Sequence, residues 1–191
     1  MRINYKHDVF KRDKNMEWIK PTDDGAENII KAIFKTQKKL KKINYANIST
    51  KRRNKLFSKL SNYELGKDFM FLTPINIDLG LNLKIGNNVF INFGCTFLDR
   101  GGISIGDNTM IGPNCSFYTS NHPLDPEKRR HIISKPIVIE NDVWFGGNVI
   151  VLPGVTIGAN STIGAGSIIR KDVPKNSLVI GDEIKPLVIK K

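Results

Sequence analysis

Residues 85–116 read IGNNVFINFGCTFLDRGGISIGDNTMIGPNCS and repeat one pattern about every six residues. An aliphatic or aromatic residue leads each unit, usually followed by glycine, and the pattern resumes at residue 139. A period of six fits neither an α-helix nor an ordinary strand. It predicts a parallel β-helix, in which each unit forms a short strand and a corner. The leading residues are Ile85, Ile91, Phe97, Ile105, Ile111, Phe117, Ile139, Phe145, Val151, Ile157, Ile163 and Ile169.

A small residue or valine stands four positions after most leading residues, and we expect it to point inward at a narrow corner. This makes Cys95 and Cys115 small buried hydrophobes rather than catalytic or metal-binding groups. Phe97 and Ile105 are eight residues apart, so the two extra residues form a turn around DRGG. If three units make one coil, the two cysteines stack on adjacent coils, and we expect them reduced in the cytoplasm. The other residues at these positions are Val89, Thr109, Val143, Val149, Val155, Ser161 and Ser167.

The region before the repeats is basic and has helical spacing. Residues 1–67 carry a balance of +11 out of a net charge of +12, and no acid lies between residues 28 and 63. We expect two short helices, the second beginning near Ser49 or Thr50, that cap the open end of the solenoid. An entry segment near Pro74 follows. The expected buried stripe of the first helix is Ile29, Ile30, Ile33, Phe34, Leu40 and Ile43.

The expected organisation is a helical segment at 1–72, the β-helix at 73–181 and a tail at 182–191, together one structural unit. No apolar run reaches the roughly 18 residues of a membrane span, and the charged start lacks a secretory signal. Two cysteines in 191 residues do not indicate a disulfide scaffold. These features predict a cytoplasmic protein. The basic segment is either a solvated helix face or a surface for a polyanion.

The stretch YTSNHPLDPEKRRHIISKP, residues 118–136, interrupts the repeats. Loops longer than about 12–15 residues in a compact domain are usually functional or disordered. This excursion loop contains His122, next to the strand led by Phe117. An imidazole, with an ordinary pKa of about 6.5, is suited to proton transfer at neutral pH. The alternative is a surface histidine with no role.

The repeats together with SNHPLDPEKR, NDVWFGGNVIVLPGVTIG and IGAGSIIRKDVPKNSLVIG resemble the maltose/galactoside O-acetyltransferases. These belong to the hexapeptide-repeat acyltransferases. The similarity covers roughly residues 20–188 and is strongest over 75–181. It implies a mainly β fold: a left-handed parallel β-helix with a short N-terminal helical segment and one long excursion loop. It also implies a homotrimer that binds acetyl-CoA between neighbouring β-helices and needs no metal.

The resemblance implies that His122 is the general base, which takes the proton from an attacking hydroxyl without a covalent acyl-enzyme. Asn92 then helps to place the acceptor, and otherwise is a corner residue. Asp78 and, less directly, Asp24 contact the acceptor; Asp24 could instead cap the following helix.

The donor side follows from the same resemblance. Trp144 lies near the groove and the CoA arm, or else packs in the core or the trimer. A backbone N–H near Gly147 is a candidate oxyanion donor, because an amide needs no particular side chain for this. Ala165 pairs with the pantetheine amides through its backbone. The expected phosphate-facing cations, each otherwise a solvated surface residue, are Arg170, Lys171 and Lys185.

This chain differs from the relatives at several positions. Its tail has GDEIK where they commonly have GNPAR, and Ile91 stands where they often have alanine. Arg100 follows Asp99 where some relatives have a second acid or an apolar residue. These differences fall mostly on the acceptor side and at the CoA tail. The acceptor is therefore left open among a sugar, a surface-polysaccharide unit and an antibiotic.

Two other classes of function fit the sequence less well. A zinc enzyme on the same solenoid would need several converging histidines, but His122 and His131 lie nine residues apart and His7 is remote. A nucleic-acid-binding or scaffold protein would suit the basic segment, which lacks a recognised nucleic-acid module or an aromatic stacking series. The sequence favours an acetyl-CoA-dependent O-acetyltransferase.

Overall fold

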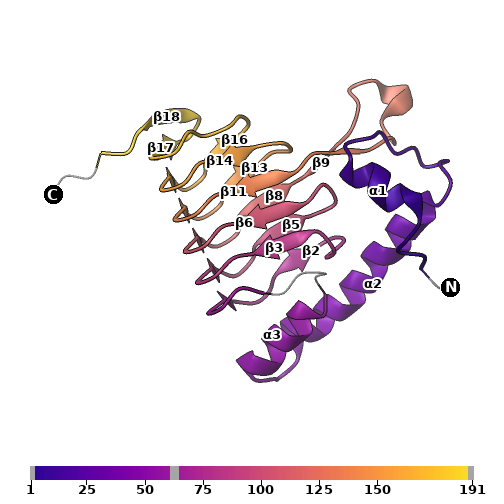
Figure 1. Cartoon of the computed structure of the whole chain (residues 1–191), viewed down its shortest axis with the longest axis horizontal. Helices are drawn as coiled ribbons and strands as arrows, with labels where there is room; N and C mark the ends of the chain where they lie inside the picture. The colour runs from indigo at the N-terminus through magenta and orange to yellow at the C-terminus, as the bar shows by residue number, and fades with distance from the viewer. Residues whose placement is uncertain (1–2, 61–64, 189–191) are drawn as a thin grey trace.

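The computed structural model describes residues 3–60 and 65–188. In these residues, three helices precede a solenoid of parallel strands, and the helices lie along one side of it (Figure 1). The helices are α1 (Asp8–Lys14), α2 (Ala26–Tyr45) and α3 (Thr50–Ser58). No helix of this described part is long and apolar enough to cross a bilayer.

The solenoid has three parallel sheets, because each coil adds one strand to each sheet. The first sheet has the order β1-β4-β7-β12-β15-β17, with β18 added antiparallel at its end. The second has the order β2-β5-β8-β13-β16, and the third β3-β6-β11-β14. These sheets span residues 70–186, which confirms the predicted β-solenoid.

The strand bounds of the first sheet are β1 (Met70–Phe71), β4 (Phe90–Ile91), β7 (Met110–Ile111), β12 (Trp144–Phe145), β15 (Thr162–Ile163), β17 (Ser177–Ile180) and β18 (Glu183–Pro186). Those of the second are β2 (Asn76–Ile77), β5 (Thr96–Leu98), β8 (Ser116–Tyr118), β13 (Ile150–Val151) and β16 (Ile168–Ile169). Those of the third are β3 (Leu83–Ile85), β6 (Ile103–Ile105), β11 (Ile137–Ile139) and β14 (Thr156–Ile157).

The interior of the solenoid is built as the repeat predicts. All twelve leading residues are buried, and so are the nine small residues four positions later. Phe97 stacks on Phe117 with ring centroids 5.0 Å apart, and Phe117 meets Phe145 edge-on at 5.5 Å. Each such aromatic pair stabilises the fold by about 0.5–1.5 kcal/mol, in addition to the effect of burying its apolar surface. The core therefore consists of apolar side chains that stack along the inner faces of the three sheets and meet in the middle of each coil.

The two cysteines stack on adjacent coils, as the spacing predicts. Thr96 pairs with Ser116 in the parallel ladder, and both thiols are free and buried. Cys95 Sγ lies 3.3 Å from the carbonyl oxygen of Gly112. The hydrogen bond with Cys115 and burial raise the pKa of Cys95 far above its ordinary value. Such a thiol is unreactive, which fits the structural role predicted for Cys95, whereas the hydrogen bond with Cys95 lowers the pKa of Cys115.

Asparagine builds several corners of the coils. Asn88, Asn108 and Asn160 have positive φ, a region that asparagine tolerates better than most residues. Their side chains also form ladders: Asn88 Nδ2 donates to Asn108 Oδ1 at 3.0 Å, and Asn108 Nδ2 donates to Asp142 Oδ1 at 3.0 Å. The recurring asparagine of the repeat thus joins consecutive corners.

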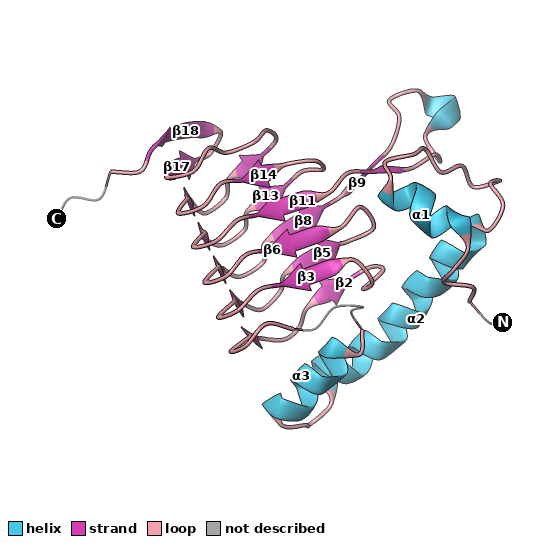
Figure 2. Ribbon diagram, viewed as in Figure 1, coloured by secondary structure: helices cyan, strands magenta, loops and turns pink. Residues whose placement is uncertain are grey.

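Helix α2 covers the outer edge of the first coil, as expected of a cap (Figure 2). Thr36 Oγ1 donates to the carbonyl of Leu79 at 2.7 Å. Asn44 both donates to and accepts from the backbone of Ile75, at 2.9 and 3.0 Å. These bonds satisfy backbone groups that no further coil can reach.

The helical prediction was wrong in three details. The chain forms an additional helix, α1, which begins after the N-cap His7. Helix α2 has 20 residues and is not short. Ile30 and Phe34 are 49% and 65% exposed, whereas Ile29, Leu40 and Ile43 are buried as predicted, and polar and small residues complete the buried stripe of α2. Those residues are Asn28, Ala32 and Thr36.

The excursion loop is a hairpin with a short tip. Strands β9 (Ser120–Asn121) and β10 (Ile133–Ser134) pair antiparallel, and a 3-10 turn covers Pro126–Lys128. Ile132 also forms a bridge with Ile19, with N–O distances of 2.8 and 2.9 Å. The base of the loop is thereby attached to the segment between α1 and α2.

Candidate active site

His122 is held at the base of the excursion loop in one orientation. Its Nδ1 lies 2.7 Å from the carbonyl oxygen of Arg129 and 3.0 Å from that of His131. Carbonyl oxygens only accept, so Nδ1 carries the proton. In the neutral ring, Nε2 is then the atom with a free lone pair. The side chain is exposed, and this nitrogen can reach a ligand from solvent.

Asn92 lies directly after β4 and is half-buried. Its Oδ1 accepts from the backbone N–H of Phe93 at 2.9 Å, which fixes the amide plane. Its Nδ2 makes no hydrogen bond to the described residues and can donate to a ligand.

Asp78 follows β2 and shares a site with Asp99. Asp78 Oδ1 accepts from the N–H groups of Leu79 at 2.6 Å and Asp99 at 2.8 Å. Asp99 is fully buried and accepts from the N–H groups of Gly80 at 2.7 Å and Asn82 at 2.8 Å. Burial, followed by the charge of Asp99 and a hydrogen bond with it, raises the pKa of Asp78 to about 8. Asp78 is therefore mostly neutral at pH 7.

Asp24 does not cap α2, so that alternative for it was wrong. The N-cap is Gly25, at φ 73°, and no side chain bonds there. Asp24 is fully exposed and pairs with His7 at 3.3 Å. Its predicted contact with an acceptor stays a prediction.

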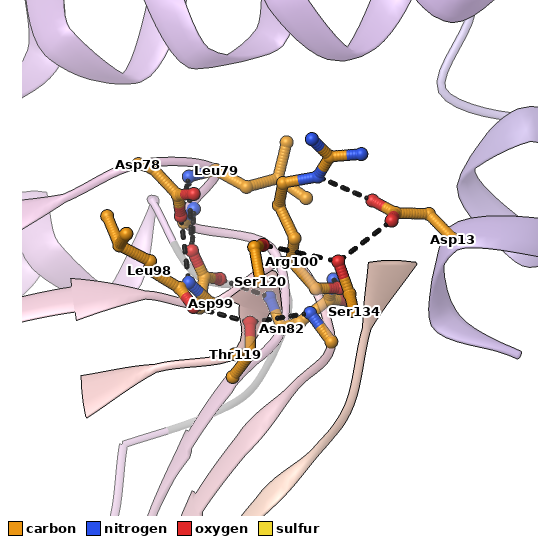
Figure 3. A network of polar contacts seen from close by, with 12 residues as sticks. Asp13, Asp78, Leu79, Asn82, Leu98, Asp99, Arg100, Thr119, Ser120 and Ser134 are labelled. Carbon is orange, nitrogen blue, oxygen red and sulfur yellow. Dashed lines mark hydrogen bonds and ion pairs between the residues drawn. The ribbon is translucent and has the colours of Figure 1, made fainter. Parts of the chain in front are cut away.

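A second polar cluster was missed in the sequence because its members are distant in the chain. Arg100 Nε donates to Asp13 Oδ2 at 2.8 Å, and both side chains are buried. Asp13 Oδ1 accepts from Ser134 Oγ at 3.0 Å, and Ser134 Oγ lies 3.2 Å from Ser120 Oγ. Figure 3 shows this chain of contacts from α1 to the excursion hairpin, beside the Asp78–Asp99 pair. The unusual Arg100 was the available signal, but nothing in the pattern indicated Asp13.

The predicted donor side lies on the later coils. Trp144 is on β12 and is 54% exposed, so it does not pack in the core of its own chain. Gly147 and Ala165 lie in stacked corners, where Gly166 N donates to the carbonyl of Gly147 at 2.9 Å. The N–H groups of Gly147 and Ala165 make no hydrogen bond among the described residues. Both can therefore donate to a ligand.

Two predicted phosphate-facing cations lie together. Arg170 and Lys171 line a pocket of about 250 Å³ that also contains Asp182 and Ile184. Lys185 does not line it, and pairs with Glu183 at 3.0 Å. Glu183 of the tail thus competes with any phosphate ligand for Lys185, one of the three predicted cations.

Within one chain, the acceptor and donor groups are not joined. No hydrogen bond or ion pair between described residues connects His122 to Asn92, Asp78 or Trp144. The described part also contains no group of three His, Cys, Asp or Glu side chains that could hold a metal ion. The arrangement offers an oriented base, free amide donors and a cationic pocket, which together suit acyl transfer from a phosphate-bearing donor.

Comparisons with known proteins agree with this chemistry. Residues 136–171 match a family of bacterial transferase hexapeptides with six repeats, and residues 102–117 match the hexapeptide repeat of succinyl-transferase. The galactoside O-acetyltransferase of Escherichia coli K12 is 42% identical over 119 residues, which cover 61% of this chain and 59% of that protein.

Two solved structures are similar along almost the whole chain. A maltose O-acetyltransferase from Clostridium difficile 630 has a TM-score of 0.85 and 34% identity, over 95% of this chain and 96% of that one. A hexapeptide-repeat acetyltransferase from Vibrio cholerae, complexed with acetyl coenzyme A, has a TM-score of 0.78 and 34% identity over 88% and 90%. The chain therefore belongs to the hexapeptide-repeat acetyltransferases and is related to the galactoside and maltose O-acetyltransferases.

Proposed function

We propose that this protein is an acetyl-CoA-dependent O-acetyltransferase, which acetylates a hydroxyl of a sugar or sugar-containing acceptor. The observation that carries the proposal is the fixed tautomer of His122. Two backbone carbonyls hold the proton on Nδ1, so Nε2 can act as a base at neutral pH. The acetyl-CoA-bound relative and the two sugar O-acetyltransferases support the choice of donor and acceptor.

The reaction proceeds by direct attack in a ternary complex. The acceptor oxygen bonds to the thioester carbonyl carbon while His122 Nε2 takes the hydroxyl proton. The carbonyl oxygen becomes an oxyanion, which the free N–H of Gly147 stabilises. The intermediate then expels the CoA thiolate, which takes the proton from the imidazolium. The products are the acetyl ester and free CoA thiol.

Donor binding uses the groups of the later coils. Ala165 pairs with a pantetheine amide through its free backbone N–H. Arg170 and Lys171 contact the phosphates of the nucleotide, for which their charge and donors are suited. Trp144 covers the arm beside the groove. Lys185, paired with Glu183, contributes less than the other two cations.

We also propose that the active unit is a homotrimer. Support comes from the outer face of the first sheet, where Met70 and Met110 are each 50% exposed and Trp144 is 54% exposed. The register aligns these residues as one apolar row, because Met110 pairs with both Phe90 and Trp144. An exposed row of this kind marks a contact surface.

Acetyl-CoA-dependent release of thiol, measured across a panel of sugars, tests the function. His122→Ala should lower kcat by about 10²–10⁴-fold, because the attacking hydroxyl loses its base. Binding of CoA, measured by calorimetry, should be retained.

His131→Ala is the matched control. His131 lies in the same loop, but it contacts His122 through its backbone carbonyl, which alanine keeps. The His131→Ala variant should keep a kcat close to that of the parent protein. Equal turnover in the His122 variant and the parent would eliminate the proposed mechanism.

A further inference from the structure

A second pocket lies where α2 meets the excursion loop. Its volume is about 260 Å³, and its apolar wall includes Ile29 and Ile30 of α2 and Ile132 of the loop. Arg100 and Arg130 also line it. Guanidinium groups inside an apolar pocket are a favourable setting for an anion, because the low local polarity strengthens charged hydrogen bonds.

Arg100 is only 5% exposed, yet its hydrogen bonding is incomplete. Its Nε donates to Asp13, and this is the only ion pair or hydrogen bond that the described residues offer its guanidinium. Nη1 and Nη2 remain for another partner. In Figure 3, the two outer nitrogens of Arg100 lie above its bond to Asp13, on the side of the helix drawn across the top. The two nitrogens are not among the buried unsatisfied atoms of the described residues, so they keep some contact with solvent and are available to a ligand in the pocket.

The charges around the pocket favour an anion. Asp13 neutralises Arg100, while Arg130 is exposed and has no hydrogen-bond or ion-pair partner among the described residues. The acid of the pocket, Glu27, already pairs with Lys31 at 3.2 Å. Lys20 adds a further cation to the lining. The local balance is therefore positive.

The pocket shares a wall with the segment that orients the base. The carbonyls of Arg129 and His131 hold His122, while the alternate residues of the same segment, Arg130 and Ile132, line the pocket. Arg100 also follows Asp99, the partner of Asp78. The pocket thus lies beside the loop segment that orients His122.

We propose that this pocket binds an acidic group of the acceptor, a carboxylate or a phosphate, so that the enzyme selects an acidic sugar over a neutral one. Nη1 and Nη2 of Arg100 form a planar fork that matches two oxygens of such a group. Because Asp13 neutralises Arg100, Arg130 supplies the net positive charge that attracts the anion. The apolar wall of the pocket packs on the sugar ring. This inference rests on the proposed acetyl transfer and names its acceptor class.

The test compares glucose, glucose 1-phosphate and glucuronic acid in the thiol-release assay. The two acidic sugars carry the two candidate anions, and all three sugars share the hydroxyls at C2, C3 and C4. We expect kcat/KM for at least one acidic sugar to exceed that for glucose by 10-fold or more. Arg130→Ala should remove most of this preference, because it should lower kcat/KM for the acidic sugar much more than that for glucose. Lys128→Ala is the matched control, because Lys128 lies in the same loop but does not line the pocket.

Arg100 needs a paired change, because removal of one partner leaves a buried charge alone. The double variant Asp13→Asn with Arg100→Gln keeps polar groups at both positions. It should lose the acidic preference, and a thermal melt checks that it folds.

Calorimetry with glucose 1-phosphate and glucuronic acid separates the two proposals. Binding that depends on Arg130, without thiol release from any acceptor, would refute the O-acetyltransferase proposal and retain the anion pocket. Thiol release with equal kcat/KM for neutral and acidic sugars, and no effect of Arg130→Ala on binding, would overturn the acidic-acceptor inference alone.

Discussion

The Asp78–Asp99 pair makes the stability of the protein depend on pH, and Asp78→Asn tests this. Asp78 has a raised pKa of about 8 in the folded chain, against an ordinary value of 3.8. Between these values the folded state holds a proton that the unfolded state lacks, so stability falls as pH rises. Asparagine resembles the protonated carboxyl, because its Oδ1 can accept from Leu79 and Asp99 as Asp78 does now.

The magnitude follows from the same shift. One extra bound proton in the folded state changes the free energy of unfolding by about 1.4 kcal/mol per pH unit in this window. Between pH 5 and pH 8 the change is at most about 4 kcal/mol. Asp78 keeps some contact with solvent, and screening reduces the effect, so we expect about 2 kcal/mol. For a chain of this length, that difference shifts Tm by about 4–8 °C.

Thermal unfolding at pH 5 and pH 8, at one protein concentration, is the assay. Asp78→Asn should be about as stable as the parent protein at pH 5 and more stable at pH 8. Asp68→Asn is the control, because Asp68 is exposed and bonds to no described residue, and its positive φ suits asparagine. If the Asp78 variant and the parent lose the same stability between the two pH values, Asp78 is not the protonated member of the pair.

The remaining predictions concern the donor side. Lys171→Ala should raise the KM for acetyl-CoA by about 10–100-fold, the value of a lost charged hydrogen bond, whereas Lys175→Ala, outside the pocket, should not. A change confined to the KM of the acceptor would contradict the role of Lys171. Gly146→Ala should lower stability by about 1–3 kcal/mol and weaken acetyl-CoA binding, because the new Cβ would lie 2.7 Å from the backbone nitrogen of Ala165. An unchanged Tm and an unchanged KM for acetyl-CoA would show that the corner at Gly146 has room for the added Cβ.

The sequence by itself determined the solenoid and its interior. Coil register follows from local rules, because each leading residue must point inward and each corner must fit a small residue. The six-residue period therefore predicted the burial of the leading residues, Phe97, Phe117 and Phe145 among them, and the stacking of Cys95 on Cys115. The interruption at 118–136 also marked His122, because a break in a regular pattern is visible without any coordinates.

The tertiary structure alone decided the polar chemistry. The tautomer of His122 depends on two carbonyls of the loop segment that precedes β10, and the raised pKa of Asp78 depends on its burial and on Asp99 in the next coil. The pairing of Arg100 with Asp13 joins residues 87 positions apart. These properties arise from burial and from the distances between side chains, and a pattern of residue types carries neither. For the same reason part of the buried stripe of α2 was misjudged: Thr36 and Asn44 face the first coil because its open backbone needs hydrogen bonds, while Phe34 is left exposed.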